Sequence, residues 1–240
     1  MVTRRYAPPV TTAPDVPAEP EPEAEPEAEP GGSPAADLEP PGSDARPRLP
    51  RSERRAQLLD AARDVFVAHG FHAAGMEDIA VRAGVSKPVL YQHFPGKLDL
   101  YLALLEASGE ALVAAVRHAL ESTPHNKQRV TATVEAYFAF VDDPSGAFQL
   151  VFESDLTNEA AVRRRIEAVN TECAVLVSRV IHEDAGFDDD ESMLLAVGLI
   201  GLAQVAARYW AASGSPVPRE EATRLTAALS WRGIGGFPRT

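Results

Sequence analysis

The residues of this chain whose types suggest chemistry are its cations, and they gather in one short stretch. Residues 46–97 carry 9 Lys or Arg against 5 Asp or Glu, whereas the 240-residue chain as a whole has a formal net charge of −12. Because Lys and Arg that neutralise phosphates dominate the affinity of proteins for nucleic acids, this basic segment favours a nucleic-acid contact within an otherwise acidic protein.

Side chains that perform catalysis or bind metals form no recognisable pattern. The sequence has no Ser/His/Asp order, no glycine loop that would cradle phosphates and no Cys/His metal spacing, and His69 and His72 lie on either side of a turn. The acidic run from Asp188 to Glu191 is typical of the start of a helix. We therefore expect no enzyme activity, no catalytic residue, no metal and no cofactor.

The basic segment overlaps three stretches of helical periodicity. Apolar residues from Leu58 to Phe66 recur at the spacing of one amphipathic helix, which we expect to end near His69, because Gly70 suits the left-handed residue that closes a helix. A second, short helix should run up to Gly84, which permits a tight turn. The third is expected to span Lys87 to Phe94.

The third helix has clear start signals. Ser86 can cap it, and Pro88 stands in its first turn, where a missing N–H costs no hydrogen bond. After Pro95, apolar residues recur at helical spacing in segments separated by Gly, Pro, Asp and Asn. We expect about six more helices and no strand, so the predicted fold class is all-α.

The first 48 residues have a different character. Of the 20 prolines, 13 fall in residues 1–50, and Glu19 to Pro30 alternates Glu with Pro or Ala. Proline opposes helix formation and the like charges repel, so this Pro/Glu-rich tail is expected to be disordered. One hypothesis is that the acidic tail competes with DNA for the basic segment; the alternative is a solvated tail without that role.

Compartment is indicated by cysteine use and by the N-terminus. The single Cys173 cannot form an intrachain disulfide, and the first residues have no apolar stretch typical of a secretory signal, so we expect a cytoplasmic protein. Residues 193–207 are apolar on nearly all sides, but a membrane span needs about 20 such residues and Gln204 interrupts this run. A helix buried in the core and at a dimer interface is expected instead, and no membrane contact.

The three short helices and the basic segment together predict a helix-turn-helix. Residues 51–105, above all IAVRAGVSKPVLYQHFPGKLDLYLALL from Ile79 to Leu105, resemble the N-terminal DNA-binding domain of TetR-family transcriptional regulators. The expected domains are therefore a tail (1–48), a helix-turn-helix DNA-binding domain (49–97) and a helical domain for ligand binding and dimerisation (98–240).

The resemblance implies which residues contact DNA. It makes the third helix the recognition helix, with Lys87, Val89 and Gln92 offered to base edges and Tyr91, His93 and Lys97 to phosphates. Burial of the two apolar residues Leu90 and Phe94 would turn the opposite face of this helix toward the major groove. The expected DNA contacts are Arg54, Arg55, Gly75, Met76, Ser86, Lys87, Pro88, Val89, Tyr91, Gln92, His93 and Lys97.

Two parts of this set are special. Family members often have Thr or Ser where Ala74 and Gly75 stand, so only backbone N–H groups remain here, and we expect a weaker phosphate contact at Gly75 and Met76. The arginines between residues 46 and 55, including Arg54 and Arg55, either reach DNA as a minor-groove arm or along the backbone, or form a flexible basic linker.

The resemblance further implies a homodimer on a pseudo-palindromic double-stranded DNA operator, joined through the last two long helices, and a cavity in the C-terminal bundle for a small-molecule effector. The run from Ala196 to Ala212 and a stripe in residues 222–229 are the candidate interface. Each expected cavity residue has plain core packing as its alternative. The expected lining is Leu102, Leu105, Val113, Tyr137, Phe140, Val141, Phe148, Val151, Phe152, Val177, Val205, Tyr209 and Trp210.

Within the family, residues 49–105 together with the block from Ala206 to Trp210 are similar to actinobacterial regulators of fatty-acid synthesis, whose effectors are long-chain acyl-CoAs. Residues 163–165 are three arginines, which either meet the phosphates of an acyl-CoA or form a solvated run. The expected function is a ligand-responsive transcriptional regulator of lipid metabolism. The alternative is a drug-responsive repressor of an efflux pump.

Overall fold

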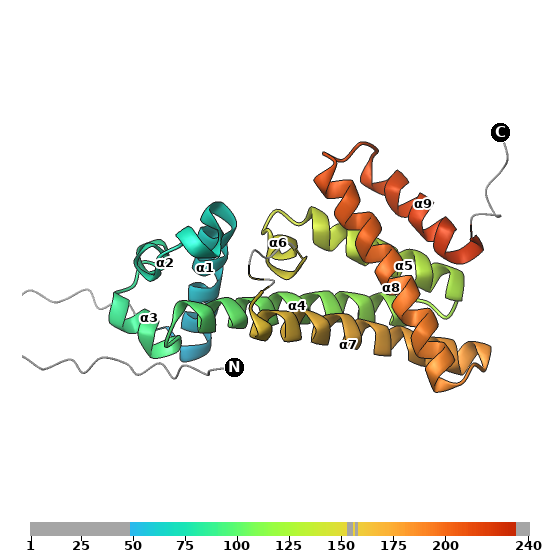
Figure 1. Ribbon diagram of the computed structural model, residues 1–240, viewed down its shortest axis with the longest axis horizontal. Coiled ribbons are helices and arrows are strands. Elements are labelled where there is room, and N and C mark those ends of the chain that lie inside the picture. Colours follow the sequence, from blue (N-terminus) through green and yellow to red (C-terminus); the bar gives the residue numbers. More distant parts are fainter. Residues whose placement is uncertain (1–48, 153–155, 157, 234–240) are drawn as a thin grey trace, which may run out of the picture. The chain divides into compact units, whose positions relative to one another are not determined.

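The computed structural model describes residues 49–152, 156 and 158–233, and these all belong to one compact unit. The expected tail, residues 1–48, lies outside the described residues. The described residues form α-helices and no strand, which confirms the all-α prediction (Figure 1). The helices are α1 (Arg51–Ala73), α2 (Met76–Ala83), α3 (Lys87–His93), α4 (Lys97–Glu121), α5 (Asn126–Asp142), α6 (Ala147–Phe152), α7 (Ala160–Ala185), α8 (Asp189–Ala212) and α9 (Arg219–Arg232).

Helices α1 to α3 form the expected helix-turn-helix. Leu58, Ile79 and Leu90, one from each helix, are fully buried together. Gly84 ends α2 in the left-handed conformation, with φ 65° and ψ 35°, where its N–H contacts the last carbonyls of that helix. Burial of apolar area provides the main stabilisation of this small unit, at about 25 cal/mol per Å².

Helix α1 differs from its expected end. Gly70 has a left-handed φ of 71°, as expected, but one more helical turn follows this kink and runs to Ala73. Phe71 folds back so that its ring lies 5.9 Å from that of Phe66 and 5.3 Å from that of Tyr101 on α4. This aromatic cluster, which sequence periodicity does not reveal, joins the end of α1 to the start of α4.

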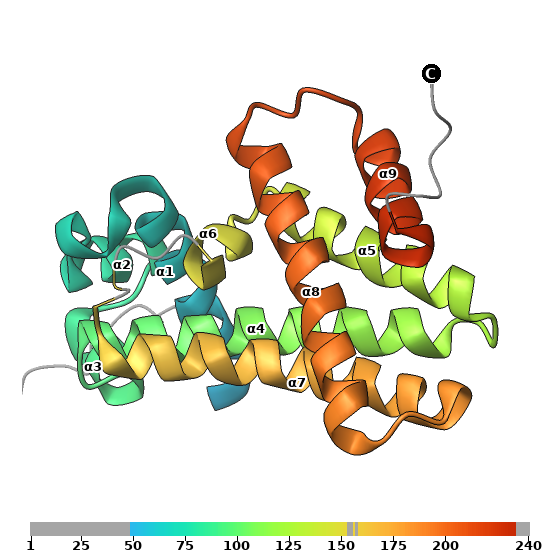
Figure 2. The ribbon, with the colours of Figure 1, turned by 45° about the vertical axis from the view of Figure 1, so that its right-hand side comes forward.

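Helix α4 connects the helix-turn-helix to the C-terminal bundle. It has 25 residues, roughly 37 Å at the rise of an α-helix, and it packs against α1, α5, α6 and α7. Figures 1 and 2 both show α4 and α7 side by side. They approach closely at Gly109, where a Cβ atom would overlap the side chain of Val169 on α7.

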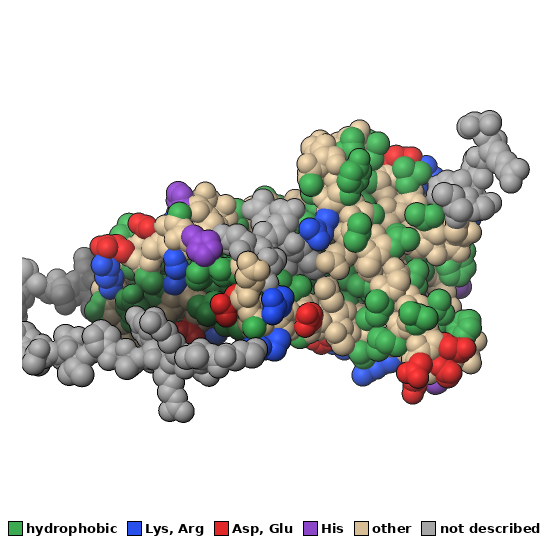
Figure 3. Space-filling model, viewed as in Figure 1, with side chains coloured by type: hydrophobic (Ala, Val, Ile, Leu, Met, Phe, Trp, Pro, Cys, Tyr) green, Lys and Arg blue, Asp and Glu red, His purple; other side chains and the backbone are tan. Residues whose placement is uncertain are grey.

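Helix α8 has apolar residues on two opposite faces. Ala196, Ile200 and Ala203 lie on the buried face, whereas Leu194, at 75% exposure, and Val205 lie on the outward face. Among the described residues α8 is the one helix that is long and apolar enough to cross a membrane, judged by length and composition only. In this fold, 28% of its apolar 18-residue stretch is buried. Apolar side chains accordingly cover much of the surface in this part of the molecule (Figure 3).

Candidate DNA interface and effector cavity

The exposed face of α3 is set by which of its residues are buried. Leu90 is fully buried and Phe94, the residue that ends the helix, is 3% exposed. Lys87, Gln92 and Tyr91 therefore point to solvent, and the Tyr91 side chain is 47% exposed. An exposed helix of this kind, with amide, phenol and ammonium groups, has the dimensions and donors to enter a major groove.

Lys87 is held by a carboxylate of α2. Its ammonium Nζ lies 2.7 Å from Oε2 of Glu77, and this hydrogen bond raises the pKa of Lys87. Both side chains are more than half exposed, so the pair adds little stability. It does orient the ammonium, and a DNA contact by Lys87 would either use the remaining N–H donors or replace Glu77.

The start of α1 brings arginines against the two other helices. Arg54 donates to the side-chain oxygen of Gln57 at 2.6 Å, and Gln57 donates to the carbonyl of Ala83 at the end of α2 at 2.8 Å. The guanidinium of Arg55 lies 4.8 Å from the ring centroid of Phe94. These two arginines are thus packed on the domain, rather than extended as a linker.

The same arginines act on His93 at the end of α3. Its pKa is lowered, first by burial of the ring and then by the positive charges of Arg51, Arg55 and Arg54. Burial and the neighbouring charges therefore both favour the uncharged imidazole in the DNA-free protein. A bound phosphate would oppose the second of these effects, because its negative charge offsets that of the arginines.

The start of α2 has an internal partner that sequence reasoning missed. The N–H of Gly75 donates to Oδ2 of Asp78 at 3.2 Å, and Met76 is half-buried against the core. A carboxylate three residues after the N-cap is the signal that would have revealed this contact. A phosphate at Gly75 must therefore displace Asp78, which adds to the loss of the usual hydroxyl group.

A mostly apolar cavity of about 530 Å³ lies in the C-terminal bundle, between the end of α4 and helices α5, α7, α8 and α9. This volume is within the range of small-molecule binding sites. Its lining residues are Leu120, Asn126, Arg129, Val130, Thr133, Val134, Val177, Val180, Ile181, Asp184, Ala185, Phe187, Leu195, Leu199, Ala203, Ser230 and Trp231.

Two polar features mark this cavity. Thr133 is only 8% exposed, and its hydroxyl has no hydrogen-bond partner within the described part of the chain. At the rim, Arg129 Nη1 and Asp184 Oδ2 form a half-buried ion pair at 2.8 Å, and Arg129 also donates to the carbonyl of Thr123. A buried hydroxyl without a partner costs about 1–3 kcal/mol, which a ligand with a polar group would recover.

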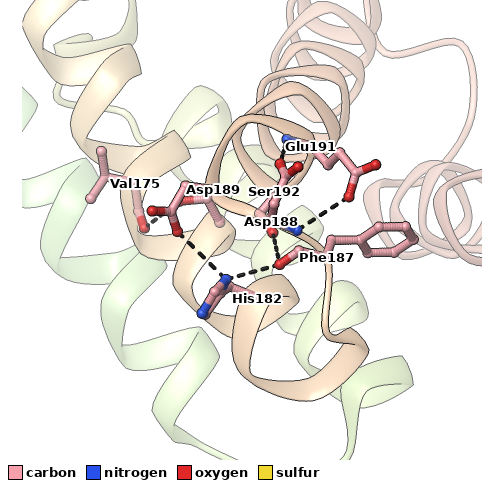
Figure 4. Close-up of polar contacts among 8 residues, drawn as sticks. Val175, His182, Phe187, Asp188, Asp189, Glu191 and Ser192 are labelled. Atoms are coloured by element: carbon pink, nitrogen blue, oxygen red, sulfur yellow. Dashed lines mark hydrogen bonds and ion pairs between the residues drawn. The ribbon is translucent and has the colours of Figure 1, made fainter.

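Phe187, which lies in the turn between α7 and α8 (Figure 4), also lines the cavity. The carbonyl of Phe187 contacts Nδ1 of His182 at 2.9 Å, and Asp188 caps α8 by accepting from the N–H of Glu191 at 2.8 Å. In return, Glu191 accepts from the N–H of Asp188 at 3.1 Å. The acidic run therefore has the structural role expected from the sequence.

Comparison with known proteins agrees with this arrangement. Residues 58–104 match the family model of bacterial regulatory proteins of the tetR family. The chain is 45% identical over 193 residues to the HTH-type transcriptional activator FasR of Mycolicibacterium smegmatis, which covers 80% of this chain and 88% of that protein. The chain belongs to the TetR family.

Solved structures of TetR-like proteins share the fold. A TetR-like transcriptional regulator from Rhodococcus sp. RHA1 is 28% identical, with a TM-score of 0.62 over 79% of this chain and all of that one. The regulator FadR of Bacillus subtilis, solved with stearoyl-CoA, has a TM-score of 0.64 at 18% identity and covers 75% of this chain and 98% of that chain. The helix-turn-helix and the helical C-terminal domain are thus those of a TetR-family transcriptional regulator.

In this TetR-family chain, most of the expected DNA-contact residues lie on one exposed side of the helix-turn-helix. Ser86, Lys87, Pro88, Tyr91 and Gln92 are exposed, and Val89 and His93 are partly buried. Lys97 is different. Its ammonium donates to the carbonyls of Phe71, His72 and Ala74 at 2.8, 3.3 and 2.8 Å.

The expected effector lining agrees with the cavity of this TetR-family protein at Val177 alone. Val205 and Tyr209 are 63% and 70% exposed on the outward face of α8, and they do not line this cavity. The physical reason is that α8 is apolar on both faces, and periodicity does not tell which face is buried. The side chains of Val151 and Phe152 lie outside the described residues.

The remaining expected lining residues pack elsewhere in the core. Leu105, Val113, Tyr137, Phe148 and Trp210 are buried, and burial also raises the pKa of Tyr137. Three others are partly buried against the core: Leu102, Phe140 and Val141. Leu102 instead borders a separate hollow of about 260 Å³ with Arg164 and Arg165.

The cavity residues that the sequence reasoning missed had a usable signal. Val130, Thr133 and Val134 follow the i, i+3, i+4 spacing of one face of α5, with a hydroxyl in an apolar row. Arg164 and Arg165, which border the smaller hollow, lie on α7 far from the cavity. Arg165 is twelve residues before the cavity residue Val177, a separation of roughly 18 Å along the helix. That hollow is not part of the cavity lining.

Proposed function

We propose that this TetR-family regulator binds a pseudo-palindromic operator as a cytoplasmic homodimer, and that a long-chain acyl-CoA in the C-terminal cavity changes its operator affinity in control of fatty-acid synthesis. Residues 49–97 would serve as the DNA-binding domain and 98–240 as the effector and dimerisation domain. The observation that carries this proposal is the apolar cavity of about 530 Å³ with an unpartnered Thr133 hydroxyl. The 45% identity to FasR, an HTH-type transcriptional activator, supports DNA binding and a role in activation.

For DNA binding, the exposed face of α3 supports base contacts by Lys87, Val89 and Gln92, with Tyr91 and His93 on phosphates. The other proposed contacts are Arg54, Arg55, Gly75, Met76, Ser86 and Pro88. Gln92 carries the amide that pairs with adenine in a major groove, whereas a phenol or imidazole near a phosphate carries no base information.

The outward face of α8 supports the homodimer. Leu194, Val197, Val205 and Tyr209 are 54–75% exposed along one stripe, and a Cβ added at Gly198 on the same face meets no atom within 4 Å. An apolar stripe with a glycine permits a close approach by a second copy of the same helix. Burial of such a stripe is the usual fate of a large exposed apolar patch.

For the effector, the apolar lining suits a hydrocarbon chain, and the Thr133 hydroxyl suits a carbonyl oxygen. Trp231 also lines an adjoining groove of about 460 Å³ whose charged residues are Lys127, Arg219, Arg224 and Arg232 together with Glu135 and Glu220. Arg219 and Arg224 form ion pairs with Asp142 and Glu221, which a phosphate would have to replace. These cations support a place for the phosphates of a coenzyme A next to the mouth of the cavity. The Bacillus subtilis FadR that shares the fold was solved with stearoyl-CoA, which supports the choice of ligand class.

A titration of a labelled operator with a series of acyl-CoAs tests the effector proposal. We expect the effect to grow by about 0.8 kcal/mol per added methylene and then to reach a plateau when the cavity is full. Planar cationic drugs and free coenzyme A are the controls. A response to the drugs alone would replace this proposal by the efflux-pump alternative, and a response to none of these ligands would leave only the DNA-binding function.

The variant Thr133→Val sharpens this experiment because its two effects have opposite signs. Removal of a buried, unpartnered hydroxyl should raise the free energy of unfolding of the ligand-free protein by about 1 kcal/mol or more. The same change should weaken acyl-CoA binding, since a hydrogen bond to the ligand is lost. An unchanged ligand affinity in a stabilised variant would show that the hydroxyl does not recognise the ligand.

A further inference from the structure

Lys97, the first residue of α4, makes an unusual set of contacts for a surface lysine. Its ammonium donates to the carbonyls of Phe71 and Ala74 at 2.8 Å each and to that of His72 at 3.3 Å. It also lies 4.6 Å from the ring centroid of Phe71. A lysine ammonium has three N–H donors, and all three have acceptors here, so none is left for a phosphate in this conformation.

The acceptors of Lys97 explain why this geometry forms. The kink at Gly70 and the end of α1 at Ala73 leave carbonyls without helical N–H partners, and these converge on one side. A cation at the C-terminal end of a helix satisfies such carbonyls and interacts favourably with the helix dipole. Lys97 therefore closes the end of α1, although it belongs to α4.

This contact ties two parts of the proposed mechanism together. Ala74 directly precedes Gly75, the N-cap of α2, so Lys97 holds the connection that positions the helix-turn-helix. At its other end, α4 contributes Leu120 to the cavity. A movement of α4 that accompanies ligand binding would therefore displace the start of α2 through a set of three hydrogen bonds.

We propose that Lys97 is a positioning residue that fastens the start of α4 to the connection between α1 and α2 and so transmits the state of the cavity to the helix-turn-helix. This inference rests on the effector response proposed above. It differs from the phosphate contact that the family resemblance implied for Lys97. The aromatic contact of Phe71 with Tyr101 on α4, at 5.3 Å, adds an apolar support to the same junction.

The test compares Lys97→Met, which keeps the aliphatic stem but has no donor, with Lys97→Arg and with Lys87→Met as a matched exposed lysine of the same domain. Operator affinity is measured across salt concentrations, with and without stearoyl-CoA. For Lys97→Met we expect the salt slope of the wild type, because the loss of one phosphate contact from each protomer of the dimer would instead reduce it by about 1.8. The ratio of affinities without and with stearoyl-CoA should fall below about twofold, against 5–150-fold for a typical allosteric coupling.

The controls separate positioning from plain structural support. Lys87→Met should keep the wild-type response ratio, and Lys97→Arg should restore most of it, since a guanidinium also donates to several carbonyls. A Lys97→Met variant that loses operator affinity but keeps the full response ratio would overturn the proposal, because general loosening of the domain weakens both states alike. A salt slope reduced by about 1.8 for the dimer, with an unchanged response ratio, would establish the phosphate contact instead.

A readout without ligand keeps this inference distinct from the effector proposal. If wild-type protein does not respond to stearoyl-CoA, the effector proposal fails, and amide hydrogen exchange at residues 75–79 then decides on the contact itself. Faster exchange there in Lys97→Met, with an unchanged salt slope, supports the fastening role. Unchanged exchange overturns it.

Discussion

At the scale of single residues, the DNA-free protein satisfies its own polar groups where DNA is expected to bind. Glu77 holds Lys87, and Asp78 accepts from the N–H of Gly75, so both carboxylates of the first turn of α2 occupy donors that a phosphate would use. A DNA phosphate that binds at Lys87 or at the N–H of Gly75 competes with these carboxylates, so the net gain in free energy is smaller than the new contacts alone suggest. Gln92 has no such competitor among the described residues and is exposed.

Gln92 and Tyr91 consequently carry different predictions. Gln92→Ala should relax the preference at one base pair and cost about 1–3 kcal/mol there, because a side-chain amide reads a base edge. Tyr91→Phe should weaken binding to all operator sequences alike, because the proposed partner of the phenol is a phosphate of the DNA backbone. A panel of single-base operator variants measures both effects. If Gln92→Ala leaves the whole panel unchanged, α3 is oriented differently in the groove.

At the scale of elements, close packing of α4 and α7 depends on Gly109. A Cβ at this position would overlap Val169, so Gly109→Ala should lower the free energy of unfolding by about 1–3 kcal/mol, although alanine alone favours a helix. Denaturant unfolding measures the change. Val169→Ala in the same chain should recover part of the loss, and additive effects of the two substitutions would contradict a direct overlap.

At the scale of the whole molecule, the exposed stripe on α8 predicts the oligomeric state. Val205→Arg places a charge in that stripe and should convert the dimer to a monomer with weak operator binding, since two recognition helices are needed for a pseudo-palindrome. Light scattering coupled to gel filtration measures the mass. Val217→Arg, on a 36% exposed residue between α8 and α9, is the control and should remain a dimer. If Val205→Arg and Val217→Arg are both dimers, the dimer interface does not lie on the exposed stripe of α8.

The sequence by itself determined the features that depend on neighbours along the chain. The three helices of the helix-turn-helix, the left-handed Gly84 and the outward face of α3 follow from helical period and glycine geometry, and the structure has them. Ser86 is the N-cap residue of α3, but its side chain does not form the expected capping hydrogen bond. The end of α3 differs by one residue, because Phe94 turns out of the helix to pack in the core. Local backbone energetics decide such features within a few residues.

Only the tertiary structure decided the features that join distant segments. Lys97 meets carbonyls from residues 23 to 26 positions earlier because of the kink at Gly70. The cavity is the space that five helices leave unfilled, so its lining depends on how these helices pack. The part of α5 that lines it is the segment from Asn126 to Val134, and the aromatic residues of α5 that the sequence suggested do not contribute. Likewise, α8 is apolar on two faces, and only packing against α5 and α7 shows that Ala203 faces inward and Val205 outward. A periodic pattern specifies a helix face, but its burial depends on which other surfaces cover it.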